Sequence, residues 1–179
     1  MSYGSLARRY SKALLDLSQE KNLLAETESE LKTFSEMVRQ NHQLKDVLGS
    51  FEIAAEKKQR VISELGAKMQ LSPLVTNFLL LLAQKDRLIA LSDIAREFTR
   101  QVDAVLGQAR AMLVSASPAS LQLVETIRQA LETKSRKKII LQEQVDPEIL
   151  GGLLLKMEGS LWDASVRGEL QKIKEQMLA

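Results

Sequence analysis

Residues 145–152 read V-D-P-E-I-L-G-G and residues 162–168 read W-D-A-S-V-R-G, and these two runs interrupt the helical pattern of the preceding chain. Proline and glycine are the residues that most often mark turns. The last quarter holds four of the eight glycines in the chain, namely Gly151, Gly152, Gly159 and Gly168. Up to Gly107, by contrast, apolar residues recur mostly at helical spacing. The sequence therefore predicts a helical part followed by a part rich in turns and strands.

Six helices are predicted before Gly107, because apolar residues recur at i, i+3, i+4 and i+7. Ser72 and Pro73 mark the start of the fifth helix, since serine is a good N-cap and proline fits the first helical turn. Gly49 and Gly66 are expected to end the third and fourth helices. The approximate ranges of the six helices are 5–21, 24–39, 42–48, 54–65, 73–82 and 91–106.

The faces of three helices can be predicted from the same spacing. In the first helix the recurring residues are Leu6, Tyr10, Ala13, Leu14 and Leu17. The fourth is expected to be apolar inside and charged outside, the outer residues being Glu56, Lys57, Lys58 and Arg60. The fifth is apolar almost all round, whereas a surface helix usually has one apolar stripe. It is either a central helix of a bundle or a helix that lines an open groove for a partner helix.

A smaller α+β part is predicted after Gly107, where the apolar period changes. A helix is expected to start at Ser117–Pro118, with Leu121 and Leu131 on its apolar face. The predicted strands are 109–116, 138–142, 153–157 and a short one at 161–162, and a last helix is expected over 166–178. The predicted fold class is thus mainly α, with a six-helix bundle at 1–106 and an α+β domain at 107–179.

Composition narrows the possible functions. Aromatic residues make up only 4% of the 179 residues, so the core must consist mostly of aliphatic side chains, as in packed helices. The net charge of +2 provides no strong field for nucleic acid or anionic membranes. With no cysteine, thiolate nucleophiles, disulfides and cysteine-ligated metals are excluded. The longest apolar run, Phe78–Ala83, is far shorter than the roughly 20 residues of a membrane span.

No set of residues suggests catalysis. His42 is the only histidine, and it is expected on the surface because one histidine cannot form a histidine-based metal site. Gly151–Gly152 lacks the lysine and serine or threonine of a phosphate-binding loop. Asp146 and Asp163 could form a carboxylate pair, but turn and helix capping explains both. The basic run 135–138 is better explained as a solvated strand entry than as a nucleic-acid contact. No catalytic, cofactor-binding or metal-binding residue is predicted.

Several short motifs, in their order and spacing, resemble the delta subunit of F-type ATP synthases, which is called the oligomycin-sensitivity-conferring protein in mitochondria. The resemblance covers essentially the whole chain. Ala164 stands where the family often has glycine, and alanine would be strained there if the position needs a positive φ. The matching motifs are 7–14 (ARRYSKAL), 77–82 (NFLLLL), 86–88 (DRL), Phe98, Gly107, 114–116 (VSA), 145–147 (VDP) with 151–152 (GG), and 163–170 (DASVRGEL).

The resemblance implies a non-catalytic subunit that joins the catalytic alpha/beta head to the peripheral stalk, as part of the stator that allows rotation to drive ATP synthesis. The N-terminal bundle would bind alpha subunits, and the C-terminal domain would bind the b, or b and b′, subunits. In the family, the N-terminal helix of an alpha subunit lies in a groove between the first and fifth helices. By position, Tyr10, Ala13, Asn77 and Leu81 match that groove. No cofactor, nucleic acid or membrane insertion is implied, and the expected location is the cytoplasmic face of a bacterial cell membrane, held there through the complex.

Two other classes of function stay open at this point. The chain could be a generic helical adaptor with accidental motif matches. It could also bind nucleic acid through Lys134, Arg136, Lys137 and Lys138, although its nearly balanced charge argues against that.

Overall fold

The computed structural model describes residues 3–50, 52–149, 151–157 and 160–166. The chain forms two compact units, Met1–Val102 and Asp103–Ala179, each with its own hydrophobic core. The division lies a few residues before the boundary expected between 106 and 107.

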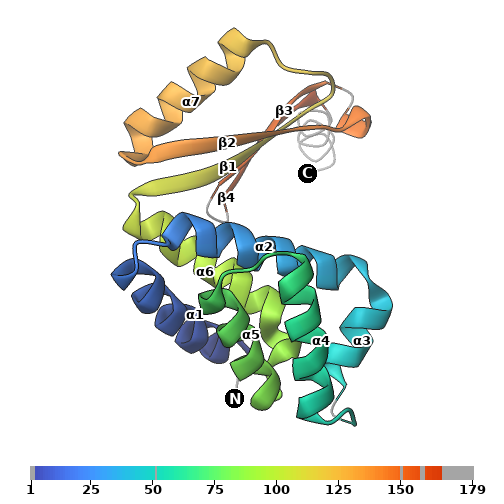
Figure 1. Ribbon diagram of the computed structural model, residues 1–179. Coiled ribbons are helices and arrows are strands. Elements are labelled where there is room, and N and C mark those ends of the chain that lie inside the picture. Colours follow the sequence, from blue (N-terminus) through green and yellow to red (C-terminus); the bar gives the residue numbers. More distant parts are fainter. Residues whose placement is uncertain (1–2, 51, 150, 158–159, 167–179) are drawn as a thin grey trace. The chain divides into compact units, whose positions relative to one another are not determined.

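The first unit is helical (Figure 1). Its described residues contain the six predicted helices and one additional short 3-10 helix, so the prediction of six N-terminal helices is confirmed. The bounds are α1 Tyr3–Glu20, α2 Leu24–Gln40, α3 His42–Gly49, α4 Ala55–Lys68, α5 Pro73–Gln84, η1 Leu88–Ala90 and α6 Leu91–Val105.

The start of α5 follows the predicted capping chemistry. The Ser72 hydroxyl accepts a hydrogen bond from the Val75 amide at 3.4 Å, and Pro73 occupies the first turn. The Glu30 carboxylate of α2 in turn accepts from the Ser72 amide at 2.9 Å and from its hydroxyl at 2.7 Å. The same serine therefore caps α5 and connects α5 to α2 through its hydrogen bonds with Glu30.

The prediction that Gly66 ends α4 is wrong, since the helix continues to Lys68. Gly66 is buried within α4, and a Cβ atom at this position would lie 3.3 Å from the Thr76 Oγ1 atom of α5. Glycine here allows α4 and α5 to approach closely, although it costs the helix about 1 kcal/mol relative to alanine. Packing therefore explains this residue better than a helix stop does.

Lys58 is also placed differently from the prediction. It was expected on the outer, charged face of α4, but it is only 1% exposed. Lys58, Ile62 and Gly66 are spaced at i, i+4 and i+8, so they share the inner face of α4. The Lys58 ammonium forms an ion pair of 2.7 Å with the Asp86 carboxylate, which follows α5 and is 46% exposed. This pairing allows a charged side chain to lie inside the helical unit.

The second unit contains a four-stranded mixed sheet and one described long helix. The strands are in the order β2-β1-β3-β4, with β1 parallel to β2 and antiparallel to β3, and with β4 antiparallel to β3. The prediction of a small α+β part is confirmed. The bounds are β1 Gln108–Ser115, α7 Leu121–Ser135, β2 Lys138–Val145, η2 Pro147–Ile149, β3 Gly152–Met157 and β4 Ser160–Ser165.

Helix α7 begins later than predicted. Ser117–Pro118 does not start it. Instead, the Ser120 hydroxyl accepts from the Leu123 amide at 3.3 Å, and the helix begins at Leu121. Leu121 was expected on the apolar face but is 85% exposed, whereas Leu131 is buried. Only the later turns of α7 therefore cover the sheet, where Leu131 packs with Ala109, Ala111 and Ile139.

The turn-rich stretch behaves partly as expected. The Asp146 carboxylate accepts from the Glu148 amide at 3.0 Å and so caps η2, as predicted. Gly151 and Gly152 have φ values of 134° and 82°, which other residues rarely adopt. Asp163 lies in β4 opposite Leu154, and the start of the last helix, which it was expected to cap, falls at the edge of the described residues. β4 is longer than predicted, and Ala164 in it is not among the described non-glycine residues with positive φ. The predicted last helix, 166–178, falls almost entirely outside the described residues.

Candidate functional site

The predicted residues of the first helix lie on the outer flank of α1. The buried face of this helix consists of Leu6, Ala7, Ser11, Leu14, Leu15 and Ser18. Tyr10 is half-buried and packs against the edge of the core, with the Arg9 guanidinium 5.5 Å from the centre of its ring. Ala13 is exposed. The two residues are one turn apart, so they form a continuous strip beside the buried face.

The buried face of α1 is rotated relative to the predicted stripe. Leu17, which shares the helical spacing of Leu6 and Leu14, is 47% exposed, while Ser11 and Ser18 are fully buried. Their hydroxyls donate to the carbonyls of Arg8 at 3.2 Å and Leu15 at 2.9 Å. A small serine that satisfies its polar group within its own helix can lie at a close helix contact. Neighbouring helices therefore pack against the small residues and leave Leu17 outside.

The predicted residues of the fifth helix lie on the outer side of α5. Asn77 is exposed and Leu81, one turn later, is 42% exposed. The remaining apolar residues of α5 are largely enclosed: Leu74 and Leu80 are half-buried, and the buried ones are Val75, Phe78, Leu79, Leu82 and Ala83. Burial in the bundle thus accounts for most of the apolar character of α5, and Leu81 is the large residue that it leaves uncovered.

Helices α1 and α5 belong to one packed unit. Leu14 of α1 and Leu79 of α5 are members of the same core, and both helices contact η1. In Figure 1, α5 stands between α1 and α4. We define the α1/α5 surface as Tyr10, Ala13 and Leu17 of α1 together with Asn77 and Leu81 of α5. Sequence reasoning missed Leu17 as a surface residue. Its position one turn after Ala13 points to the surface, but it also lies one turn after the buried Leu14, so the spacing alone was ambiguous.

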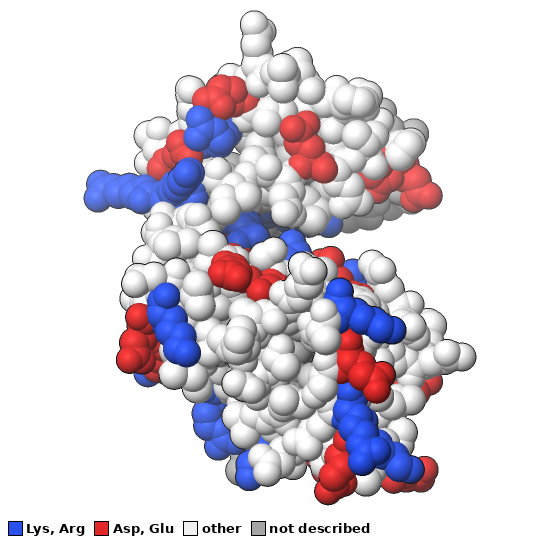
Figure 2. Space-filling view, viewed as in Figure 1, with Lys and Arg blue, Asp and Glu red and all other residues white. Residues whose placement is uncertain are grey.

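The α1/α5 surface carries no charge of its own, although α1 has charged residues on the sides of the strip. Arg8, Arg9, Lys12 and Asp16 of α1 are all exposed. In the view of Figure 2, basic and acidic side chains are interspersed, and uncharged residues occupy most of the area. This surface therefore has the composition of a contact for an apolar partner face with a charged rim.

Behind α1, a polar network joins this helix to α6. The Arg100 guanidinium donates to both oxygens of Glu97 at 2.9 and 2.6 Å. The Gln101 amide donates to Glu97 at 3.2 Å and to the Ser11 hydroxyl of α1 at 2.9 Å. Hydrogen bonds from Arg100 lower the pKa of the Glu97 carboxyl, with further lowering by Gln101 and by the charges of Arg100 and Arg8, while burial acts in the opposite direction. The ionised form of Glu97 therefore helps to hold α1 in place.

Replacing Glu97 with Gln is expected to lower the free energy of unfolding by about 1 kcal/mol at neutral pH, because a charge-assisted hydrogen-bond network is lost. The folded-state pKa of Glu97 is below its ordinary value of 4.5. The stabilisation is therefore present above that value and is lost as the pH falls through the folded-state pKa. Urea unfolding of both proteins across this pH range measures the difference. Glu64→Gln, at an exposed position of α4, is the matched control. A difference for Glu97→Gln that stayed constant with pH would contradict the prediction.

The other residues singled out from the sequence are not brought together into a reactive site. His42 is exposed at the first position of α3. Arg136 has a φ of 55° at the end of α7, and Lys138 begins β2, so the basic run forms the connection between helix and strand. Among the described residues, no group of three or more histidine, cysteine, aspartate or glutamate side chains is placed to hold a metal ion. No helix within that part of the chain is long and apolar enough to cross a membrane.

Comparisons with known proteins cover nearly the whole chain. The family described as ATP synthase delta (OSCP) subunit matches residues 6–177. "ATP synthase subunit delta" of Geobacter sp. (strain M21) is 35% identical over 175 residues, covering 98% of this chain and 97% of the relative. The protein of the same description from Solidesulfovibrio magneticus is 36% identical, covering 99% and 98%. A chain in the cryo-EM structure of the Toxoplasma gondii mitochondrial ATP synthase hexamer has the same fold, with a TM-score of 0.69 at 21% identity, covering 97% of this chain and 98% of that one.

Proposed function

The chain belongs to the ATP synthase delta (OSCP) subunit family, and we propose that its helical unit binds the catalytic head while its sheet unit binds the peripheral stalk. The protein is a non-catalytic member of the ATP synthase complex and a stator component that links the head to the stalk. A rotary synthase needs such a link, because a head that turned with the central shaft would do no work on its catalytic sites. The task requires firm binding under lateral load and no reactive groups.

The partner proposed for the helical unit is the N-terminal helix of an alpha subunit. The observation that carries this proposal is the exposure of Ala13, Leu17 and Leu81 on two helices that share one core. An amphipathic helix could lay its apolar face along the α1/α5 surface and cover them. Burial of apolar area contributes about 25 cal/mol per Å², distributed over many side chains, which suits a contact that must resist load.

The partners proposed for the sheet unit are the b, or b and b′, subunits of the stalk. The sheet unit has a core separate from that of the helical unit, so the two binding tasks can reside in separate parts of the chain. We further propose that the protein lies at the cytoplasmic face of the bacterial cell membrane, attached there through the complex.

A fragment of residues 1–105 is expected to fold alone and to bind the head but not the stalk. It contains the whole core of the helical unit and ends with α6, so its fold should not depend on the sheet unit. Circular dichroism measures the folding, and pull-down with purified heads and with purified b subunits measures the two interactions. The full chain, which should capture both partners, is the positive control. Capture of b subunits by the fragment would contradict the division of tasks.

A further inference from the structure

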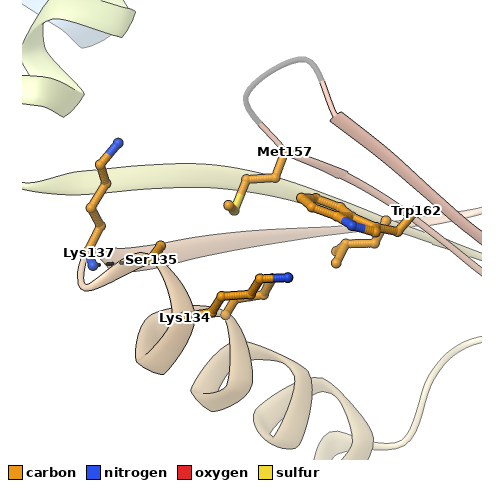
Figure 3. Close-up of a pocket in the computed structure, with 7 residues that line it drawn as sticks. Lys134, Ser135, Lys137, Met157 and Trp162 are labelled. Atoms are coloured by element: carbon orange, nitrogen blue, oxygen red, sulfur yellow. Dashed lines mark hydrogen bonds between the residues drawn. The ribbon is translucent and has the colours of Figure 1, made fainter.

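The sheet unit contains a cavity of about 430 Å³ between α7 and the strands β3 and β4 (Figure 3). Its apolar lining comes from Leu131 of α7, Leu155 and Met157 of β3, and Trp162 of β4. Lys134 and Lys137 also line it. Small-molecule pockets have volumes of about 300–1,000 Å³ and a mostly apolar lining with few polar groups, so this cavity falls in their range.

The arrangement of the elements explains why the space is open. Helix α7 contacts β2, and its buried Leu131 packs with Ala109, Ala111 and Ile139, which belong to β1 and β2. On the other side of β1, Leu155 pairs with Trp162 across β3 and β4. Trp162 remains 40% exposed. The apolar surface of these two strands is therefore only partly covered within the described residues.

One cation is directed along the cavity. The Lys134 ammonium lies 5.9 Å from the centre of the Trp162 ring, and Figure 3 shows its side chain extending toward that ring. In the same view the Lys137 side chain stands at the left, farther from the Trp162 ring than Lys134, and does not extend toward that ring. None of the described residues that line it is acidic. The neighbouring Glu132 of α7 already accepts hydrogen bonds from Arg128 at 2.7 Å and from the Ile139 amide at 3.1 Å. A negative group entering the cavity would thus meet the Lys134 ammonium, and no carboxylate of the described lining residues would compete with it.

We propose that this cavity binds a small apolar carboxylate, such as an alkyl or aryl carboxylic acid. The hydrocarbon part fills the space between Leu131, Leu155 and Met157 and packs against the Trp162 ring. The carboxylate pairs with the Lys134 ammonium at the mouth. Apolar burial supplies most of the affinity, and the single cation supplies the preference for a negative head group. The site lies in the sheet unit and is independent of the α1/α5 surface.

Trp162 makes the proposal directly testable, since it is the only tryptophan of the chain. Titrating the full chain with decanoate, below its micelle concentration, is expected to give a saturable change in tryptophan emission. Decanol, which has the same hydrocarbon chain without the charge, should bind about tenfold more weakly, which corresponds to about 1.4 kcal/mol. Lys134→Met should weaken decanoate by a similar factor and leave decanol unchanged. Lys134 is exposed, so the variant should keep the fold.

Lys137→Met is the matched control, because it removes a neighbouring lysine whose side chain points elsewhere. It should bind decanoate as the parent does. The proposal is overturned if the emission change does not saturate, if decanol binds as tightly as decanoate, or if Lys134→Met and Lys137→Met affect decanoate equally.

Discussion

Ala13→Asp is expected to weaken binding of the N-terminal peptide of an alpha subunit by about a hundredfold, or roughly 3 kcal/mol. Ala13 lies in the middle of α1, exposed on the strip between Tyr10 and Leu17. If a partner helix covers this strip, the new carboxylate is removed from water, and none of the five residues of the α1/α5 surface carries a positive charge to pair with it. An unpaired buried charge is far more costly than the loss of one methyl contact.

The fold itself should tolerate this substitution. Ala13 is exposed in the unbound chain, so aspartate there remains solvated and costs only the difference in helix propensity, about 0.7 kcal/mol. Ala130→Asp is the matched control, since Ala130 is also exposed in the middle of a helix, α7 of the other unit. Calorimetric titration of parent and both variants with the same peptide measures the affinities. Equal affinity of Ala13→Asp and the parent would exclude this position from the contact.

Asp86→Asn is expected to lower the free energy of unfolding by about 2–3 kcal/mol, through its effect on Lys58. The Lys58 side chain is 2% exposed, and Asp86 is the partner of its ammonium at 2.7 Å. Removing the negative charge leaves a buried ammonium without compensation. The expected loss is smaller than the roughly 3–5 kcal/mol for breaking a fully buried pair, because Asp86 is itself 46% exposed. Substitution by asparagine tests the loss of the charge alone, because Asp86 has a φ of 50° and asparagine also tolerates this backbone conformation.

Lys58→Met should have a much smaller effect, within about 1 kcal/mol of the parent, because it removes the buried charge together with the need for a partner. In this background, Asp86→Asn should cost almost nothing. Urea unfolding of the parent, the two single variants and the double variant forms a double-mutant cycle that measures the coupling. Lys57→Met is the control: it removes a lysine from the adjacent, exposed position of α4, where no buried ion pair is lost. A loss for Asp86→Asn that is equal in both backgrounds would show that the pair does not carry the effect.

Much of the fold could be predicted because its signals are local. Ser72–Pro73 begins α5, and Asp146 caps the turn that follows β2, since a capping side chain bonds to an amide only two or three residues away. Gly107 has a φ of 62° in the turn two residues after the end of α6, where glycine avoids strain. Helical spacing of apolar residues found all six N-terminal helices. At the start of α7 the local signal was misleading, because the sequence predicted a start at Ser117–Pro118 whereas Ser120 caps the helix.

The α1/α5 surface was only partly predictable. Tyr10, Ala13, Asn77 and Leu81 entered through the family resemblance, and the structure leaves all four at least partly exposed. Whether they bind an alpha subunit stays a prediction. Leu17 could not be assigned to the surface from its spacing alone, because its spacing fits the buried stripe equally well. Its exposure depends on the burial of Ser11 and Ser18 on the neighbouring side of α1.

By itself, the sequence determined the order of the described long helices and the bounds of most of them to within two residues, the change to strands after Gly107 and the absence of a cysteine-based site. Only the tertiary structure decided that Gly66 lies inside α4, that Lys58 is buried beside Asp86, and that β1 lies between β2 and β3. The physical reason is the distance along the sequence over which each kind of interaction acts. Caps and periodicity act over one or two turns, whereas the environment of a side chain is set by elements far away in the sequence that pack against it.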